Sequence, residues 1–473
     1  MTILRSMVTN TAARSVTEII NRLGSVIFWV FVARYLGPKG LGSIAFSLSL
    51  FTFFGTVATL GLGSAVIRDV AKNPGRRGLY FSNTLFLGFF SSIFFALLMI
   101  VVARLINPSP ATLFATMLMA VAILPFSGFY WSRTILWALE KLSYVAVART
   151  AETVFKIAGA ITVLMLGYGL TQVIIVLILS RVVSFIICFA FAVRMVDFKM
   201  TINKWLIRNL LRQAPSFSLI AVFNAMFWSL TVVFITKFRG DAEAGLYSAA
   251  FKFVDICISF AHAYGQALFP ILSRLTEMGP KLLDVLFRKS LKYLTLITMA
   301  IATSIAMLAE QLIPLIFGPA MVGAVPILRV LIWLIIPFGN VPILAYILIS
   351  YHRQKQDLLA NMVATTVLVI LLILTVPLWG AMGASVSLLV GCSVFFAVEV
   401  YSVHSGIKRL RLSLKSTSSV LSIAFMAVAF FTLKGFNPII QIISGGFIFL
   451  FYLWVTGHVA DFENNFLRQL KSV

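Results

Sequence analysis

Charged side chains are scarce in this sequence. Among its 473 residues there are 15 Asp and Glu and 38 Lys and Arg, so charged residues make up 11% of the chain and apolar residues 60%. A soluble globular domain carries about 25% charged residues. The shortage of charge and a mean hydropathy of +1.02 exclude a soluble domain of this length and indicate a protein that crosses a membrane many times.

Residues that ligate metals or form disulfides are also rare. The chain has four His and only three Cys, and Cys188, Cys257 and Cys392 all lie inside apolar stretches. An odd number of cysteines implies no disulfide framework, and no His/Cys/Asp cluster suggests a metal site. Phosphate-loop, dinucleotide-binding and nucleophile-elbow motifs are missing from any suitable setting. We therefore expect no enzyme, no cofactor and no ATP-driven pump without a partner subunit.

Long apolar stretches dominate what is present. About fourteen are long enough to cross a bilayer, which takes ~20 residues. The first contains Arg14, Glu18 and Arg22 and lacks a cleavage pattern, so it is not a removable signal peptide. The predicted spans are 10–35, 41–65, 80–104, 111–132, 143–167, 171–194, 215–237, 245–271, 291–313, 326–350, 358–379, 382–404, 417–434 and 437–458.

The net charge of +23 is explained by membrane topology. Lys and Arg are roughly five times as frequent in the termini and the loops on their side as in the opposite loops, as expected for cytoplasmic loops. We therefore predict a multi-pass protein of the cell membrane (inner or plasma membrane), with both termini in the cytoplasm. Its basic loops should contact anionic membrane lipids, and nucleic acid is not an expected partner.

An internal repeat divides the chain into two lobes. Residues 40–46, GLGSIAF, resemble residues 245–251, GLYSAAF, and residues 123–126, ILPF, resemble residues 335–338, IIPF. We predict an all-α membrane protein with two six-helix lobes related by a pseudo-two-fold axis along the membrane normal. The predicted parts are an N-lobe (1–195), an amphipathic cytoplasmic linker (196–214), a C-lobe (215–404) and a C-terminal helix pair with a cytoplasmic tail (405–473).

The span at 245–271 carries a narrow polar stripe. Lys252, Asp255 and His262, with three uncharged polar residues, recur at steps of three and four and share one helix face. Charge at mid-bilayer is costly, so the stripe must face a partner helix or a wet cavity. Two interpretations remain open for His262, namely an interhelical hydrogen bond and titration in proton coupling.

Similar stripes occur in the N-lobe. The first span has Arg14, Glu18 and Arg22 on one face, and the fifth has Arg149, Glu152 and Lys156. Local ion pairing and ligand contact are both open for these groups. Arg181, in the sixth span, has no acidic neighbour in sequence, so its partner must come from another helix or from a ligand.

Within the spans, cations outnumber acids. The acids counted are Glu18, Glu152, Asp255 and Glu399, and Arg329 and Lys252 add to the cations of the N-lobe. Unpaired cations in a membrane are costly without an anion or water, and the planar fork of Arg suits phosphate. We therefore expect a pyrophosphate-bearing substrate at the cations, with Glu18, Glu152, Asp255 and His262 as counter-charges or ion-coupling groups. Glu399, near a helix end, is assigned a structural role.

Four segments resemble those of a known family. They are LGPKGLGSIAFSLSLF (36–51), GLGSAVIRDVAKNP (61–74), RQAPSFSL (212–219) and FRGDAEAGLYSAAFKFVD (238–255). With the polar first span, they look like the polysaccharide transporter family, the Wzx-type O-antigen flippases. That family shares a superfamily with the multidrug extruders and the lipid II flippase.

The resemblance implies a function. It implies fourteen helices, a central cationic cavity, and transfer of a polyprenyl-pyrophosphate-linked oligosaccharide from the cytoplasmic to the outer leaflet by alternating access. Membrane proteins of polysaccharide assembly are further expected partners. The alternative is an ion-coupled multidrug exporter of the same fold, in which acids rather than cations should dominate the cavity.

Overall fold

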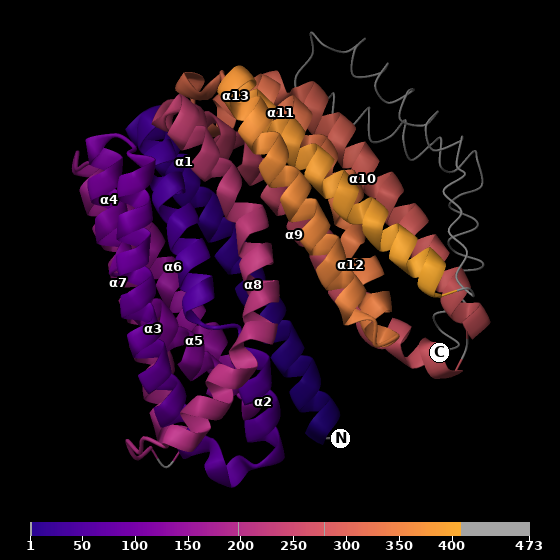
Figure 1. Ribbon diagram of the computed structural model, residues 1–473. Helices are drawn as coiled ribbons and strands as arrows, with labels where there is room; N and C mark the ends of the chain where they lie inside the picture. Colours follow the sequence, from indigo (N-terminus) through magenta and orange to yellow (C-terminus); the bar gives the residue numbers. More distant parts are fainter. Residues whose placement is uncertain (1, 197, 279, 408–473) are drawn as a thin grey trace. The chain divides into compact units, whose positions relative to one another are not determined.

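The computed structural model is helical (Figure 1). It describes the backbone of residues 2–196, 198–278 and 280–407, and the side chains of this range from Asn21 onward, apart from 22–23, 216–217, 277–278 and 280–281. No strand occurs within these residues. The elements are α1 (Thr2–Ala58), α2 (Gly63–Lys72), η1 (Pro74–Arg76), α3 (Arg77–Ile106), α4 (Pro110–Ala120), α5 (Ile123–Ala138), α6 (Leu142–Met165), α7 (Leu170–Met195), α8 (Lys204–Arg239), α9 (Asp241–Met278), α10 (Pro280–Phe317), η2 (Pro319–Met321), α11 (Ala324–Leu331), η3 (Ile332–Leu334), α12 (Ile335–Ser350) and α13 (Gln354–Gly406).

The predicted all-α membrane architecture is confirmed. Nine helical segments within the described residues are long and apolar enough to cross a membrane. The predicted spans up to residue 404 all lie on these helices or on α6, because α1 and α13 each hold two spans joined at a kink, at Gly37 and Gly380. The predicted spans 417–434 and 437–458 fall outside the described residues.

The chain forms two compact units, Met1–Ser248 and Ala249–Val473. The predicted linker region is structured within the first unit. There α8 begins at Lys204 and runs through Pro215 without a break. Leu206 and Leu210 are buried in the first unit, whereas the basic residues of the same stretch, Lys204, Arg208 and Arg212, are exposed. The stretch is therefore amphipathic, and it forms the first turns of a long helix.

Left-handed backbone positions recur in the two halves of the chain. Four such positions in the first half have a counterpart about 210 residues later, which supports the internal repeat. Each lies at a helix break or turn, where the chain must reverse or bend. The pairs are Gly37 and Gly240, Asn107 and Gly318, Glu140 and His352, and Gly167 and Gly380.

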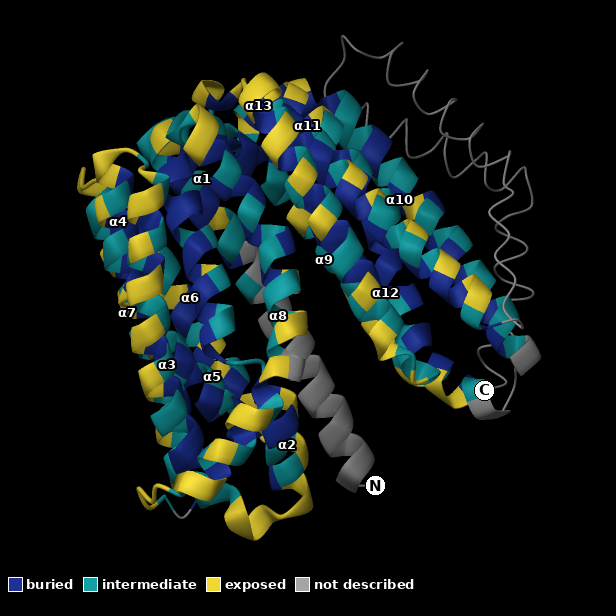
Figure 2. Cartoon of the chain, viewed as in Figure 1, coloured by how far each residue is buried: buried dark blue, intermediate teal, exposed yellow. Residues whose placement is uncertain are grey.

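Each unit has its own apolar core. In the first unit, Phe81, Trp131 and Leu136 are buried with residues of α7 and α8. In the second, Phe287, Ile343 and Val403 belong to one buried cluster. Large apolar side chains on the opposite helix faces remain exposed, as along α3 (Figure 2). Such faces suit contact with lipid chains, because the hydrocarbon core contains no water.

The start of α9 crosses α1 at very short range within the first unit. A Cβ atom on Gly42 would overlap the carbonyl oxygen of Asp241, and one on Gly245 would overlap the carbonyl oxygen of Pro38. The Asp241 carboxylate accepts hydrogen bonds from the hydroxyls of Ser109 and Thr112, at 2.6 and 2.8 Å. Glycine is thus required at this crossing. The hydrogen bonds of the Asp241 carboxylate also connect the start of α9 to the start of α4.

Candidate functional site

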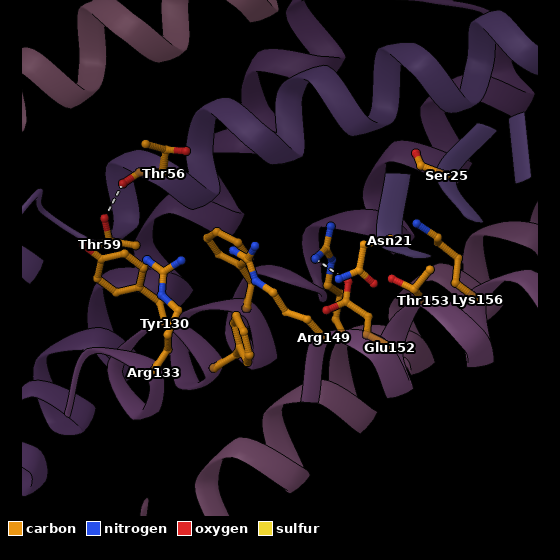
Figure 3. A pocket seen from close by; sticks show the side chains of 13 residues that line it. Asn21, Ser25, Thr56, Thr59, Tyr130, Arg133, Arg149, Glu152, Thr153 and Lys156 are labelled. Atoms are coloured by element: carbon orange, nitrogen blue, oxygen red, sulfur yellow. Dashed lines mark hydrogen bonds and ion pairs between the residues drawn. The ribbon is translucent and has the colours of Figure 1, made fainter. Parts of the chain in front are cut away.

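A polar cavity of about 510 Å³ lies inside the first unit. It is lined by α1, α5, α6 and α7 and by Thr59, which follows the end of α1. Figure 3 shows Tyr130 and Arg133 at one end of the cavity, Lys156 at the other, and Arg149 and Glu152 between them. The lining residues are Asn21, Ser25, Thr56, Thr59, Phe126, Phe129, Tyr130, Arg133, Arg149, Glu152, Thr153, Lys156 and Arg181.

Arg181 of α7 binds Glu152 of α6 across the cavity wall. The distance from Arg181 Nη1 to Glu152 Oε1 is 2.5 Å, and the side chains are 30% and 11% exposed. The Arg181 guanidinium also lies over the rings of Phe51 and Phe126, 5.4 and 5.9 Å from their centroids. The sequence predicts that the partner of Arg181 comes from another helix or from a ligand. In the structure the partner is Glu152 of another helix.

The hairpin of α6 and α7 accounts for this pairing. Gly167 turns the chain with a φ of +80°, a conformation that glycine adopts without strain. Further along, a Cβ atom on Gly159 would approach Val176 Cγ1 to 2.8 Å, so the two helices are in close contact there. The tight turn and the small residue hold the faces of Glu152 and Arg181 together.

Arg149 and Lys156 lie on either side of Glu152 along α6. Lys156 Nζ lies 5.6 Å from the centroid of the Phe28 ring, a cation–π distance. The exposed Arg149 forms no hydrogen bond or ion pair with another described residue. The sequence left local pairing of Glu152 with these two neighbours open, but the carboxylate binds Arg181 instead. Among the described residues, none therefore competes with a ligand for Arg149.

Arg133 is a lining residue that the sequence analysis missed. Its guanidinium lies 5.0 Å from the centroid of the Tyr130 ring and 5.8 Å from that of Trp137, and its Nε is buried without a hydrogen-bond partner among the described residues. The predicted span ended at residue 132, whereas α5 continues to Ala138. The sequence feature that could have identified Arg133 is its position between two aromatic residues, since Tyr130, Arg133 and Trp137 share one helix face.

The second unit holds the other predicted site residues whose side chains are described. Arg329 Nη2 binds Glu310 Oε1 at 2.8 Å, which ties α11 to α10. Glu310 lies within the predicted span 291–313, so it is a fifth acid beyond the four counted from the sequence. Asp255 is exposed, and the His262 ring lies 5.8 Å from that of Phe338.

Four predicted site residues remain, three in the first span and Lys252. The side chains of Arg14, Glu18 and Arg22 lie outside the described residues. Lys252 lies on α9 with intermediate exposure. Of all the predicted site residues, the structure brings Arg149, Glu152, Lys156 and Arg181 together in one cavity.

The lining suits an anion that carries neutral polar groups. Four cationic side chains face one carboxylate among the described lining residues, and five hydroxyls, including that of Tyr130, and one amide supply neutral hydrogen-bonding groups. Guanidinium groups donate paired hydrogen bonds to phosphate oxygens. Hydroxyl and amide groups bind sugar hydroxyls, and Phe126, Phe129 and Tyr130 add apolar wall.

The sequence profile of the "Polysaccharide biosynthesis protein" family matches residues 7–276. The chain belongs to this family. A curated relative, an uncharacterized membrane protein of Methanocaldococcus jannaschii, is 23% identical over 265 residues, which cover 55% of this chain and 52% of that protein. The match thus spans about half the length of that relative.

Solved structures share the fold of this family member. The lipid II flippase MurJ in an inward closed conformation aligns with a TM-score of 0.79 at 15% identity, covering 94% of this chain and 99% of that one. An inward-facing MATE family multidrug resistance transporter of the MOP superfamily aligns with a TM-score of 0.68 at 15% identity, covering 82% and 94%. At this identity, the alignments establish the fold.

Proposed function

We propose that the protein is a flippase for a polyprenyl-pyrophosphate-linked oligosaccharide, which it moves from the cytoplasmic to the outer leaflet by alternating access. The observation that carries this proposal is the cation-rich cavity inside a membrane-spanning unit. The polysaccharide biosynthesis family supports a role in making surface polysaccharide. The fold shared with the lipid II flippase supports transport of a lipid-linked substrate.

The charge of the cavity favours a pyrophosphate group as ligand. Arg149 and Arg133 have no acidic partner among the described residues, while Arg181 uses one nitrogen of its guanidinium for Glu152. A guanidinium has five N–H donors, so Arg181 can bind Glu152 and a phosphate oxygen together. A dianion would balance the charges of Arg133 and Arg149, and its glycan would contact the hydroxyl groups of the wall.

The second candidate is an ion-coupled multidrug exporter of the same fold, because MATE transporters align with the chain. The cavity argues against a cationic cargo. Arg133, Arg149, Lys156 and Arg181 would repel a cationic drug, and Glu152 is already bound to Arg181. A transport assay with both cargo classes separates the two functions.

The function is tested with purified protein in liposomes that carry a fluorescent polyprenyl-pyrophosphate-linked sugar in both leaflets. We expect the protein to move this lipid between leaflets, and to leave a matched lipid with a neutral head group in place. Transport of cationic dyes without transport of the pyrophosphate lipid would favour the exporter. Liposomes with heat-denatured protein are the control for leakage.

We expect Arg149→Ala to weaken binding of the lipid-linked substrate about 10- to 100-fold, because a hydrogen bond to a charged group contributes about 1.5–3 kcal/mol. The measurement is the transport rate at subsaturating substrate. Arg194→Ala is the control, since Arg194 is an exposed residue in the last turn of α7 and does not line the cavity. Equal rates for the two variants would remove Arg149 from the binding site.

We further propose that the protein lies in the cell membrane (inner or plasma membrane) with both termini in the cytoplasm, and that it meets membrane lipids and polysaccharide-assembly proteins there. Reporter fusions at Ser109, Ala242 and Gly380 should then report the outer side, and fusions at Arg76 and Lys204 the inner side. The expectation rests on the asymmetry of Lys and Arg. Two or more reversed sites would contradict this orientation.

A further inference from the structure

A pair of carboxyl groups, one of them fully buried, lies in the second unit, far from the cationic lining in sequence. Glu399 lies in the second half of α13, and Asp357 lies in its first half. The left-handed residue Gly380 (φ 57°) kinks α13 between them, so that its halves form a hairpin. Glu399 is 0% exposed. The two halves of α13 are in contact on either side of this level, because the Thr375 and Ser387 hydroxyls lie 2.8 Å apart and the Arg353 guanidinium contacts Gly406. This register places the Asp357 and Glu399 side chains within hydrogen-bonding reach of each other.

Neither carboxylate oxygen of Glu399 receives a hydrogen bond from an N–H or O–H donor within the described residues. An ionised carboxylate only accepts hydrogen bonds. Two ionised carboxylates in contact would repel each other, and a buried anion without donors is strongly disfavoured. The contact with Asp357 therefore requires a proton between the two groups, which then titrate as a pair.

No described cation neutralises this pair. Within the described residues, no Lys, Arg or His side chain forms a hydrogen bond with a carboxylate oxygen of Glu399. The nearby Arg353 guanidinium packs at Gly406, which is seven residues or ~10 Å along the helix from Glu399. On α11, Arg329 binds Glu310, and on α10, Arg288 binds Asp284.

The other titratable groups on these elements are also accounted for. On α12, which packs against α13, the titratable side chain is Tyr346, and the turn before α13 carries Tyr351 and His352. The remaining titratable groups of α13 and of the facing half of α10 are Lys355, Cys392, Tyr401, His404, Lys289, Lys292 and Tyr293. None of them forms a hydrogen bond with a carboxylate oxygen of Glu399.

Polar side chains continue from Asp357 into the helix hairpin. Asn361 and Thr365 follow it at intervals of four residues, on the same face of α13, and they are 7% and 1% exposed. Thr365 Oγ1 donates to Asn361 Oδ1 at 3.2 Å. Asp357 and Glu399 thus lie toward the end of the hairpin that is opposite Gly380, and a row of polar side chains runs from Asp357 along α13 toward Gly380.

We propose that Asp357 and Glu399 form a proton-binding site that couples transport to the binding and release of a proton. In the conformation described, the pair holds one proton. When the two halves of α13 separate at this end, water reaches both carboxyls and the proton leaves to water, so that both groups become anions. Return of the halves to contact requires a proton to be taken up again, so the balance between the closed and the open hairpin depends on pH.

Infrared spectroscopy of the purified full-length protein tests the proton site directly. At neutral pH we expect a carbonyl band of a protonated carboxylic acid. The band should be lost in Glu399→Gln and kept in Glu310→Gln, a matched change at an acid that binds Arg329. It should also be lost in Asp357→Asn, because the new amide donates a hydrogen bond to ionised Glu399. A band that persists in both Glu399→Gln and Asp357→Asn overturns the proposal.

The coupling rests on the proposed transport function and is tested in liposomes with and without a pH gradient. We expect the ratio of transport rates in the two conditions to fall to unity in Glu399→Gln and to stay at the wild-type value in Glu310→Gln. A Glu399→Gln protein that keeps the wild-type ratio overturns the coupling. If wild-type protein moves no lipid-linked sugar, the proposed function fails, while the infrared band still decides whether the proton site exists.

Discussion

We expect Arg181→Ala to lower transport about 100-fold or more, because removing one partner of a hydrogen-bonded charge pair costs about 2–5 kcal/mol. Two effects combine in this variant. A phosphate-binding group is lost, and Glu152, at 8% exposure, is left as an unpaired acid that repels an anionic substrate. The measurement is the transport rate of the pyrophosphate-linked lipid in liposomes, normalised to the amount of inserted protein.

The double variant Arg181→Ala/Glu152→Gln separates the two effects. It removes the guanidinium and the acid together, so it should recover part of the transport lost in Arg181→Ala. Glu152→Gln alone should be mild, since it removes a counter-charge and leaves the guanidinium. Arg181→Lys should be partly active at best, because the charge remains while the fork geometry is lost. Normal transport by Arg181→Ala would remove this residue from the binding site.

The second large effect is expected at the crossing of α1 and α9. Because a Cβ on Gly42 would overlap the carbonyl oxygen of Asp241, Gly42→Ala should open this contact. Overpacking costs about 1–3 kcal/mol, which shifts the population about 5- to 150-fold against the conformer that contains it. Transport should fall because the cycle loses one of its end states.

Thiol labelling measures this shift. Thr112 is 0% exposed and donates to Asp241 at the crossing. In a cysteine-free background, Thr112→Cys should react slowly with a water-soluble thiol reagent, and Gly42→Ala should raise its rate about 5- to 150-fold, as the population shift predicts. Gly75→Ala is the control, because a Cβ atom there meets nothing within 4 Å. Equal labelling rates in the two variants would show that the crossing tolerates a methyl group.

The helices were predictable because the physics of the bilayer simplifies the problem. A stretch of ~20 apolar residues must be helical in hydrocarbon, where every backbone group needs an internal partner. Glycine, proline and asparagine mark the breaks between helices, as at Gly37–Pro38 and Asn107–Pro108. The continuity of α8 through Pro215 was less predictable, because a proline in a long helix marks either a kink or an end.

The site was only partly predictable, since pairing between helices leaves no spacing pattern in the sequence. Glu152 has two basic neighbours at helical spacing, yet it binds Arg181 of another helix. Arg133 was overlooked because hydropathy locates where an apolar run ends, and α5 continues beyond that point. The contact of Glu399 with Asp357 depends on the fold-back of α13 at Gly380, which no local pattern reports.

The excess of cations around the cavity has a consequence for voltage. Moving one elementary charge across a potential of 100 mV involves about 2.3 kcal/mol. Arg133 and Arg149 have no acidic partner among the described lining residues, so a dianionic head group seated there forms a nearly neutral complex. In the proposed cycle, the membrane potential therefore acts little on the loaded protein. It acts mainly on the return of the empty one, whose positive charge a cytoplasm-negative potential draws back toward the side where the substrate is loaded.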